Sequence, residues 1–168
     1  GSFDVAEISS ASLSAELPSW FPIGVILVVV GMLFKIAAVP FHFWAPDVYE
    51  GSPSLTTATM STLAKIVAMA TLYKLLSGLT SLSPKVELLI VIISILSMTV
   101  GNIMALKQTN VKRMLAFSGI SHAGFMLMTL LSLTTSASSL LYYTTAYALS
   151  GIAAFSVILY VCKNKHNE

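Results

Sequence analysis

Five long apolar runs, separated by short polar connections, make up most of the chain. A helix needs about 20 predominantly apolar residues to cross the hydrocarbon core of a bilayer. No useful length of the chain alternates with a period of two, so the pattern does not predict strands. The runs predict membrane-spanning helices at about 21–44, 55–77, 86–106, 111–131 and 139–161. Because the connections are short, we expect antiparallel neighbours in an all-α polytopic membrane protein.

Polar segments flank this apolar part. Residues 1–19 are Ser-rich and contain three acidic residues, and residues 162–168 form a polar tail. Trp20 and Phe21 mark the start of a membrane domain over 20–161, because aromatic rings favour the membrane interface. The chain begins with Gly-Ser rather than methionine, and no signal peptide precedes the first run. We therefore expect the 168 residues to be a fragment of a longer protein.

Composition excludes the soluble class. The chain is 56% hydrophobic and only 10% charged, whereas a soluble domain has about 25% charged residues. A net charge of +2 without a basic patch argues against a nucleic-acid partner. Cys162 is the single cysteine, so neither a disulfide framework nor a metal site is predicted. Glycine loops for phosphate, dinucleotide fingerprints and zinc helix motifs are also absent from the sequence.

The basic residues outside the runs predict the orientation in the membrane. Five fall on the side that also holds the connection at 45–54, and two fall on the side of the N-terminus. Since cytoplasmic loops carry the excess of lysine and arginine, the N-terminus is predicted outside and the C-terminus in the cytoplasm. The larger group is Lys107, Lys112, Arg113, Lys163 and Lys165, and the smaller group is Lys74 and Lys85.

Two further lysines, Lys35 and Lys65, lie inside apolar runs. A lysine at the bilayer centre is unfavourable by about 2.5–3.5 kcal/mol or more unless it finds a partner or water. Ser61 and Thr62 precede Lys65 by four and three residues, so a helix would place their hydroxyls on its face. We therefore expect that neighbouring groups switch the protonation of these two amines. Snorkelling to an interface is the alternative for both.

Pro40 interrupts the first run between Lys35 and His42. Proline lacks a backbone donor and frees a carbonyl near Ile36, which lipid cannot satisfy. We expect two half-helices with an irregular joint that lines a cavity, as in transporters. His42 titrates near neutral pH and suits a proton relay, although an interfacial or packing role remains open.

Later polar positions offer a second set of candidates. His122 lies in the fourth run near Gly119 and Gly124, which allow helices to approach closely. A relay role and a helix–helix hydrogen bond are both open for His122. The fifth run carries a polar stripe that is more typical of packing and interhelical hydrogen bonds: Tyr143, Tyr147 and Ser150.

Two stretches resemble a known family. They are residues 34–74, which contain the specific run HFWAPDVYEGSP, and residues 101–127, GNIMALKQTNVKRMLAFSGISHAGFML. Both closely resemble the antiporter-like membrane subunits of respiratory complex I, over about residues 20–160 of the chain. Related hydrogenases and multi-subunit cation/proton antiporters share the general pattern, but usually differ at PDVYEG.

The resemblance implies that the chain is part of a proton-translocating subunit of NADH:quinone oxidoreductase in a bacterial inner membrane. Lys35 matches the central lysine of a half-channel, Lys65 the bridging lysine, and His42 and His122 histidines of the connecting hydrophilic axis. It also implies a partner glutamate before residue 1 and a further lysine after residue 168.

Because the sequence carries no signature of a cofactor or metal site, we expect neither in this chain. NADH, flavin, iron–sulfur clusters and quinone would belong to other subunits, which with lipid and protons are the expected partners. The alternatives are a subunit of a cation/proton antiporter or membrane-bound hydrogenase, and a purely structural membrane segment.

Overall fold

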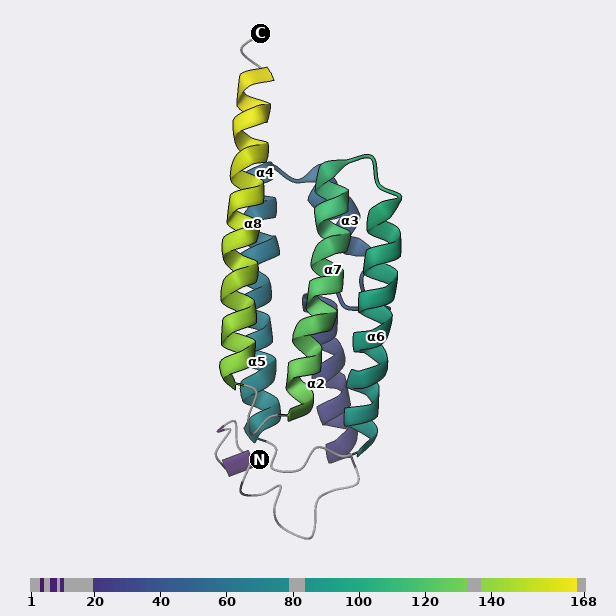
Figure 1. The fold of residues 1–168 in the computed structure, drawn as a ribbon. Helices are drawn as coiled ribbons and strands as arrows, with labels where there is room; N and C mark the ends of the chain where they lie inside the picture. The colour runs from purple at the N-terminus through teal and green to yellow at the C-terminus, as the bar shows by residue number, and fades with distance from the viewer. Residues whose placement is uncertain are drawn as a thin grey trace.

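The chain forms an up-and-down bundle of helices (Figure 1). The computed structural model describes residues 4, 7–8, 10, 20–78, 84–132 and 137–165. Every regular element within these ranges is helical, which confirms the all-α prediction. The elements are α2 (Phe21–Lys35), α3 (Trp44–Gly51), α4 (Ser54–Thr59), the π-helix η1 (Met60–Ala64), α5 (Lys65–Gly78), α6 (Pro84–Leu106), α7 (Val111–Thr129), the 3-10 helix η2 (Leu130–Ser132) and α8 (Ala137–Lys165).

Three helical stretches are long and apolar enough to cross a membrane: Ser54–Gly78, Val86–Leu106 and Ala137–Cys162. The apolar helix α2 is shorter, but α3 continues its course along the bundle, so the two halves form one passage (Figure 1). The 19-residue helix α7 runs antiparallel to α6 and returns along the bundle. These features confirm a polytopic membrane protein.

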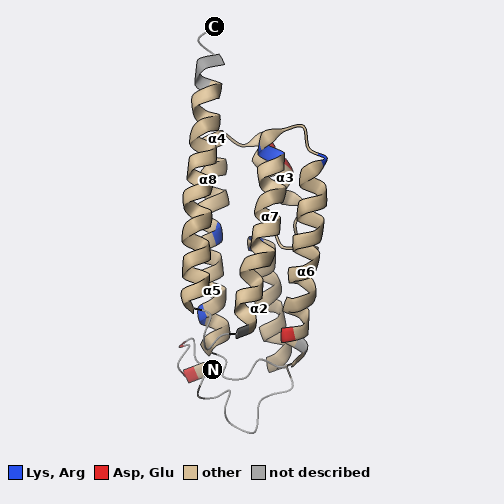
Figure 2. Cartoon of the chain, in the orientation of Figure 1, with Lys and Arg blue, Asp and Glu red and all other residues tan. Residues whose placement is uncertain are grey.

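Some sequence predictions fall at the edges of the described residues. The helix α8 continues to Lys165, so part of the predicted polar tail at 162–168 is helical, and residues 166–168 lie outside the described part. Most of the predicted segment 1–19 lies outside it as well. Figure 2 shows charged residues gathered near the two ends of the bundle, with blue segments also at mid-height. The orientation across the membrane stays a prediction.

The break in the first run begins before the proline. The helix α2 ends at Lys35, and turns lead through a cis peptide bond between Val39 and Pro40 into α3. This early end has a steric cause, because a proline ring clashes with the carbonyl four residues before it, here that of Ile36. Ala37 has a positive φ of 59° at the turn.

Protein groups, rather than lipid, satisfy the backbone of this joint. Ile36, Ala37 and Ala38 are fully buried, and the Val39 N–H donates a 3.0 Å hydrogen bond to Ser97 Oγ on α6. The Trp44 indole N–H donates to the Phe34 carbonyl at 3.1 Å, which ties α3 back to α2. A broken helix is therefore stable here, because its freed polar groups find partners inside the protein. The cavity expected at this joint stays a prediction.

The helices α6 and α7 approach closely at two glycines. A Cβ atom at Gly101 would lie 2.7 Å from the Ser121 backbone nitrogen, and one at Gly124 would lie 2.8 Å from the Ser94 carbonyl. Ser94 Oγ also donates a 2.7 Å hydrogen bond to the Gly124 carbonyl. Gly124 thus has the close-packing role expected of it, and Gly101 shares that role.

Candidate functional site

Lys65 is the buried amine at the centre of the candidate site. Its side chain is only 4% exposed, and its Nζ atom has no hydrogen-bond partner among the described residues. A Cβ atom at Gly119 would lie 2.7 Å from Nζ, so the amine rests directly against the backbone of α7. An unpartnered amine in such surroundings is energetically unfavourable, which favours a functional reason for its presence.

Ser61 and Thr62 lie near Lys65 but do not bind its amine. Both side chains are buried. Their hydroxyls each donate to the Ala58 carbonyl, at 3.0 Å for Ser61 and 2.7 Å for Thr62. Bonding back to the preceding turn satisfies a hydroxyl in apolar surroundings. The expected contact between these hydroxyls and the amine is therefore not formed.

A π-helical turn, η1, stands directly before Lys65 on the same span. Such turns open the hydrogen-bond ladder and are frequent at functional sites. Within η1, the Ser61 carbonyl accepts a 3.1 Å hydrogen bond from the Tyr147 hydroxyl on α8. The second span is thus tied to α8 next to the buried amine.

Tyr147 brings its hydroxyl to the same place as the Lys65 amine. A Cβ atom at Gly119 would lie 2.7 Å from Lys65 Nζ and 3.0 Å from the Tyr147 hydroxyl, so these atoms are at most about 5.7 Å apart. Gly119 was expected to allow two helices to approach closely. It instead leaves room for two polar side-chain ends.

His122 extends this cluster along α7. Its Nδ1 atom lies 2.8 Å from the Tyr143 hydroxyl, and its ring centroid lies 5.1 Å from that of Tyr147. Tyr143 also lines an open hollow of about 460 Å³ near the start of α8. Two members of the polar stripe therefore join the site, whereas the exposed Ser150 bonds back to the Tyr147 carbonyl. The sequence did not reveal that Tyr143 and Tyr147 both face His122.

Lys35 occupies different surroundings from Lys65. It is the last residue of α2 and is exposed. It lines an open hollow of about 550 Å³ between α2 and the η1–α5 segment, with mostly apolar neighbours that include Leu63 and Val67. No carboxylate lines this hollow in the described part of the chain. The hollow leaves space beside Lys35 for a partner residue that does not belong to the described part of the chain.

His42 lies at the joint between α2 and α3. It is 8% exposed, and its Nδ1 atom is buried without a hydrogen-bond partner among the described residues. Its ring lies against that of Phe43, with centroids 4.4 Å apart. Of the four predicted relay residues, the described contacts bring together only Lys65 and His122, through Tyr147. No described contact joins Lys35 or His42 to that cluster.

Charged residues connect the N-terminal end of α7 to α3 and to the residue that follows it. Arg113 binds Asp47 at 2.6 Å and Glu50 at 2.8 Å, both on α3. Lys112 Nζ donates to the Ser52 carbonyl at 2.9 Å. The structure thus places a basic group of the same chain against both Asp47 and Glu50.

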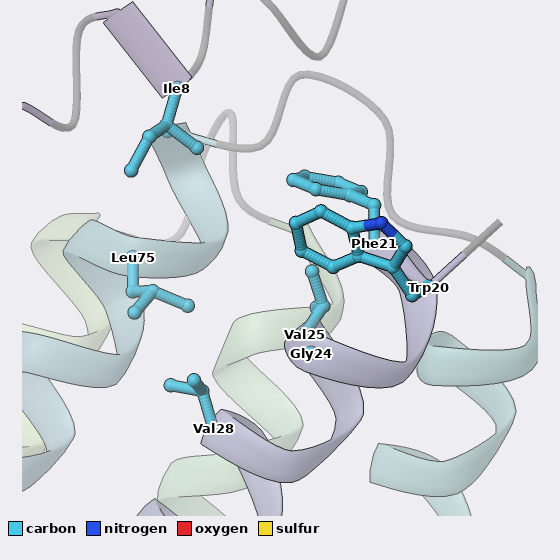
Figure 3. A pocket seen from close by; sticks show the side chains of 8 residues that line it. Ile8, Trp20, Phe21, Gly24, Val25, Val28 and Leu75 are labelled. Atoms are coloured by element: carbon cyan, nitrogen blue, oxygen red, sulfur yellow. The ribbon is translucent and has the colours of Figure 1, made fainter. Parts of the chain in front are cut away.

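An apolar hollow lies at the other end of the bundle, between α2 and α5 (Figure 3). Its volume is about 270 Å³, and Trp20, Phe21, Val25 and Leu75 are among the residues that line it. None of the described residues that line it carries a charged side chain, so this described lining offers no group that exchanges protons. No group of three or more His, Cys, Asp or Glu residues in the described ranges could hold a metal ion.

Comparison with known families gives a match over the whole chain. A family model described as "NADH:quinone oxidoreductase/Mrp antiporter, TM" matches residues 1–168. The chain belongs to this family. The membership confirms the resemblance first seen in HFWAPDVYEGSP and in the stretch around His122.

Individual members of the family are similar over the whole chain. The chain is 73% identical to a protein named NADH-quinone oxidoreductase subunit N from Flavobacterium johnsoniae, and 62% identical to that of Flavobacterium psychrophilum. Both matches cover 100% of this chain, but only 38% and 37% of the relatives. These matches agree with the resemblance to the antiporter-like membrane subunits of complex I, and within that group they show a likeness to the bacterial N subunit.

A solved structure shows the same fold. A chain of respiratory complex I from Thermus thermophilus, solved with bound aureothin, matches with a TM-score of 0.74 and 31% identity. The match covers 92% of this chain and 38% of that chain. The present chain thus spans less than two fifths of the length of the relatives that it matches.

Proposed function

We propose that this chain is part of a proton-translocating membrane subunit of NADH:quinone oxidoreductase. Family membership and the named relatives support the assignment. The observation that carries it is the Lys65 amine, which is buried, lacks a hydrogen-bond partner in the described part, and lies beside Tyr147 and near His122. The subunit would lie in a bacterial inner membrane, with residue 1 toward the periplasm and residue 168 toward the cytoplasm.

In this proposal, Lys35, His42, Lys65 and His122 take up and release protons when charge shifts along the membrane arm. Moving one charge through 100 mV takes about 2.3 kcal/mol. A tenfold change in the proton affinity of an amine corresponds to about 1.4 kcal/mol. Modest changes in the surroundings of a buried lysine are therefore on the scale that pumping requires. NADH, flavin, iron–sulfur clusters and quinone would act in other subunits, and these subunits with lipid are the proposed partners.

The decisive experiment replaces Lys65 by methionine in the full-length subunit of the intact complex. The matched control is Lys74→Met, because Lys74 is an exposed lysine of the same helix. NADH oxidation, proton uptake into inverted membrane vesicles and the amount of assembled complex are measured together. We expect Lys65→Met to reduce pumping per complex strongly and Lys74→Met to leave it unchanged. Normal pumping by Lys65→Met would refute the proposed function.

Lys35 and His42 are tested in the same vesicles, because no described contact joins either residue to the Lys65 cluster. Lys35→Met and His42→Asn are each expected to reduce pumping per assembled complex. The family description also names Mrp antiporters. Exchange of sodium for protons in vesicles without NADH would instead assign the chain to that branch of the family.

A further inference from the structure

Tyr147 lies close to both Lys65 and His122. Its hydroxyl lies at most about 5.7 Å from Lys65 Nζ, as the positions of both atoms around Gly119 require. Its ring lies 5.1 Å from the His122 ring, measured between centroids. Two hydrogen bonds through one water molecule can span the separation between the Tyr147 hydroxyl and Lys65 Nζ. The phenol thus lies where a link between the lysine and the histidine needs a polar group.

The Tyr147 hydroxyl is held in this place by the second span. It donates a 3.1 Å hydrogen bond to the Ser61 carbonyl, which lies 86 residues earlier in the π-turn η1. Ser61 is buried, and its own hydroxyl is bound to the Ala58 carbonyl. The carbonyl therefore fixes the phenol without competition from the neighbouring serine side chain.

Gly119 sets the space between the two polar ends. An alanine methyl group there would lie 2.7 Å from Lys65 Nζ and 3.0 Å from the Tyr147 hydroxyl. Both contacts are with the ends of flexible side chains, which would move aside while the backbone stays in place. Glycine at this position thus allows the amine and the hydroxyl to meet against the same turn of α7.

We propose that Tyr147 is a positioning residue of the relay, which holds a hydroxyl near the Lys65 amine, beside Gly119, and its ring against that of His122. This inference rests on the proposed function. The titratable groups around the phenol are Lys65 on the second span, His122 on α7, Tyr143 on α8 and Tyr49 on α3. Removing the Tyr147 hydroxyl is therefore expected to change proton exchange at several neighbouring groups. The pH dependence of pumping should change as a result.

The test uses Tyr147→Phe, which removes the hydroxyl but keeps the ring, in the full-length subunit of the intact complex. Tyr160→Phe is the matched control, since Tyr160 lies on the same helix and is 68% exposed. Loss of one neutral hydrogen bond predicts a decrease in pumping per assembled complex of about fivefold. The pH profile of pumping is expected to move by about half a unit or more, because the exchanging groups are no longer aligned. Gly119→Ala should reduce pumping in the same direction with Tyr147 intact.

Two outcomes would overturn the inference while leaving the proposed function standing. The first is normal pumping and a normal pH profile for Tyr147→Phe alongside impaired Lys65→Met. The second is a lower amount of complex with an unchanged rate per complex and an unchanged pH profile, which would make Tyr147 structural only. Normal pumping by Lys65→Met would instead overturn the proposed function, and this inference with it.

Discussion

The Nδ1 atom of His122 and the hydroxyl of Tyr143 lie 2.8 Å apart and join α7 to α8. The contact is partly buried, and the ring of Phe125 also lies near Tyr143, with centroids 6.3 Å apart. A histidine ring has two distinct nitrogens, and a bond to one of them selects the role of the other. Tyr143 therefore orients the imidazole beside Tyr147.

Replacing Tyr143 by phenylalanine should release the His122 ring. The ring packing is kept, whereas the bond that orients the imidazole is lost. One neutral hydrogen bond of this kind predicts a two- to fivefold decrease in pumping, or about 0.5–1 kcal/mol. Proton uptake by vesicles that contain the intact complex measures the effect.

Tyr142→Phe is the control for this change, because Tyr142 is the adjacent residue and is 79% exposed. It should leave pumping unchanged. Equal rates for the two variants would show that the His122–Tyr143 bond has no part in proton transfer.

Gly101→Ala tests the close approach of α6 and α7. A methyl group there would meet the Ser121 backbone nitrogen at 2.7 Å and the Phe117 carbonyl at 2.9 Å. Backbone atoms cannot move aside as side-chain ends do, so the two helices must separate. Overpacking of this kind predicts a loss of stability of about 1–3 kcal/mol, seen as a lower thermal denaturation temperature of the purified complex.

The same substitution at Gly24 gives the comparison, since a Cβ atom there meets nothing within 4 Å. Gly24→Ala should leave the denaturation temperature unchanged or raise it slightly, because alanine favours helix. A denaturation temperature that falls equally in both variants would argue against the α6–α7 contact as the cause.

The helices and the burial of Lys65 could be predicted from the sequence, because both depend on the length of an apolar run. A run such as 86–106 is long enough to span by itself, and it reappears as the apolar part of α6. Lys65 is buried as its position midway along the second run implies. The end of α2 at Lys35 was harder to place, because the steric effect of Pro40 extends back to Ile36.

Contacts between distant segments could not be predicted from the sequence. The Tyr147–Ser61 hydrogen bond depends on the register of α8 against a π-turn, and neither is visible in a hydropathy pattern. Arg113 and Asp47 are 66 residues apart, and many other pairings of acidic and basic residues fit the same sequence.

Arg113→Gln should weaken the attachment of α3 to α7 more than Asp47→Asn does. Arg113 binds two carboxylates, so Asp47→Asn still leaves the 2.8 Å contact with Glu50. Both contacts are exposed, and salt screens them, with a Debye length of about 3 Å at 1 M ionic strength. The denaturation temperature of the purified complex should therefore fall in Arg113→Gln at low salt, and the difference from the unchanged protein should shrink at high salt. A difference that does not depend on salt would contradict an electrostatic role.

Ser97→Ala should destabilise the joint of the broken helix. Ser97 is fully buried, and its hydroxyl oxygen accepts the Val39 N–H at 3.0 Å. Alanine would leave this buried donor without a partner, which is unfavourable by about 1–3 kcal/mol. We expect a lower denaturation temperature of the complex together with reduced pumping, because the joint holds Lys35 and His42 on either side of it.

Thr99→Ala is the matched change for Ser97→Ala on the same helix. Thr99 is exposed, and its hydroxyl donates only to the Ile95 carbonyl of its own helix, at 2.8 Å. Removing that hydroxyl frees no backbone donor, so both the denaturation temperature and pumping should stay close to those of the unchanged protein. If Ser97→Ala behaved like Thr99→Ala, the Val39 N–H would not depend on Ser97, and the packing of Ile36, Ala37 and Ala38 together with the Trp44–Phe34 hydrogen bond would hold the joint.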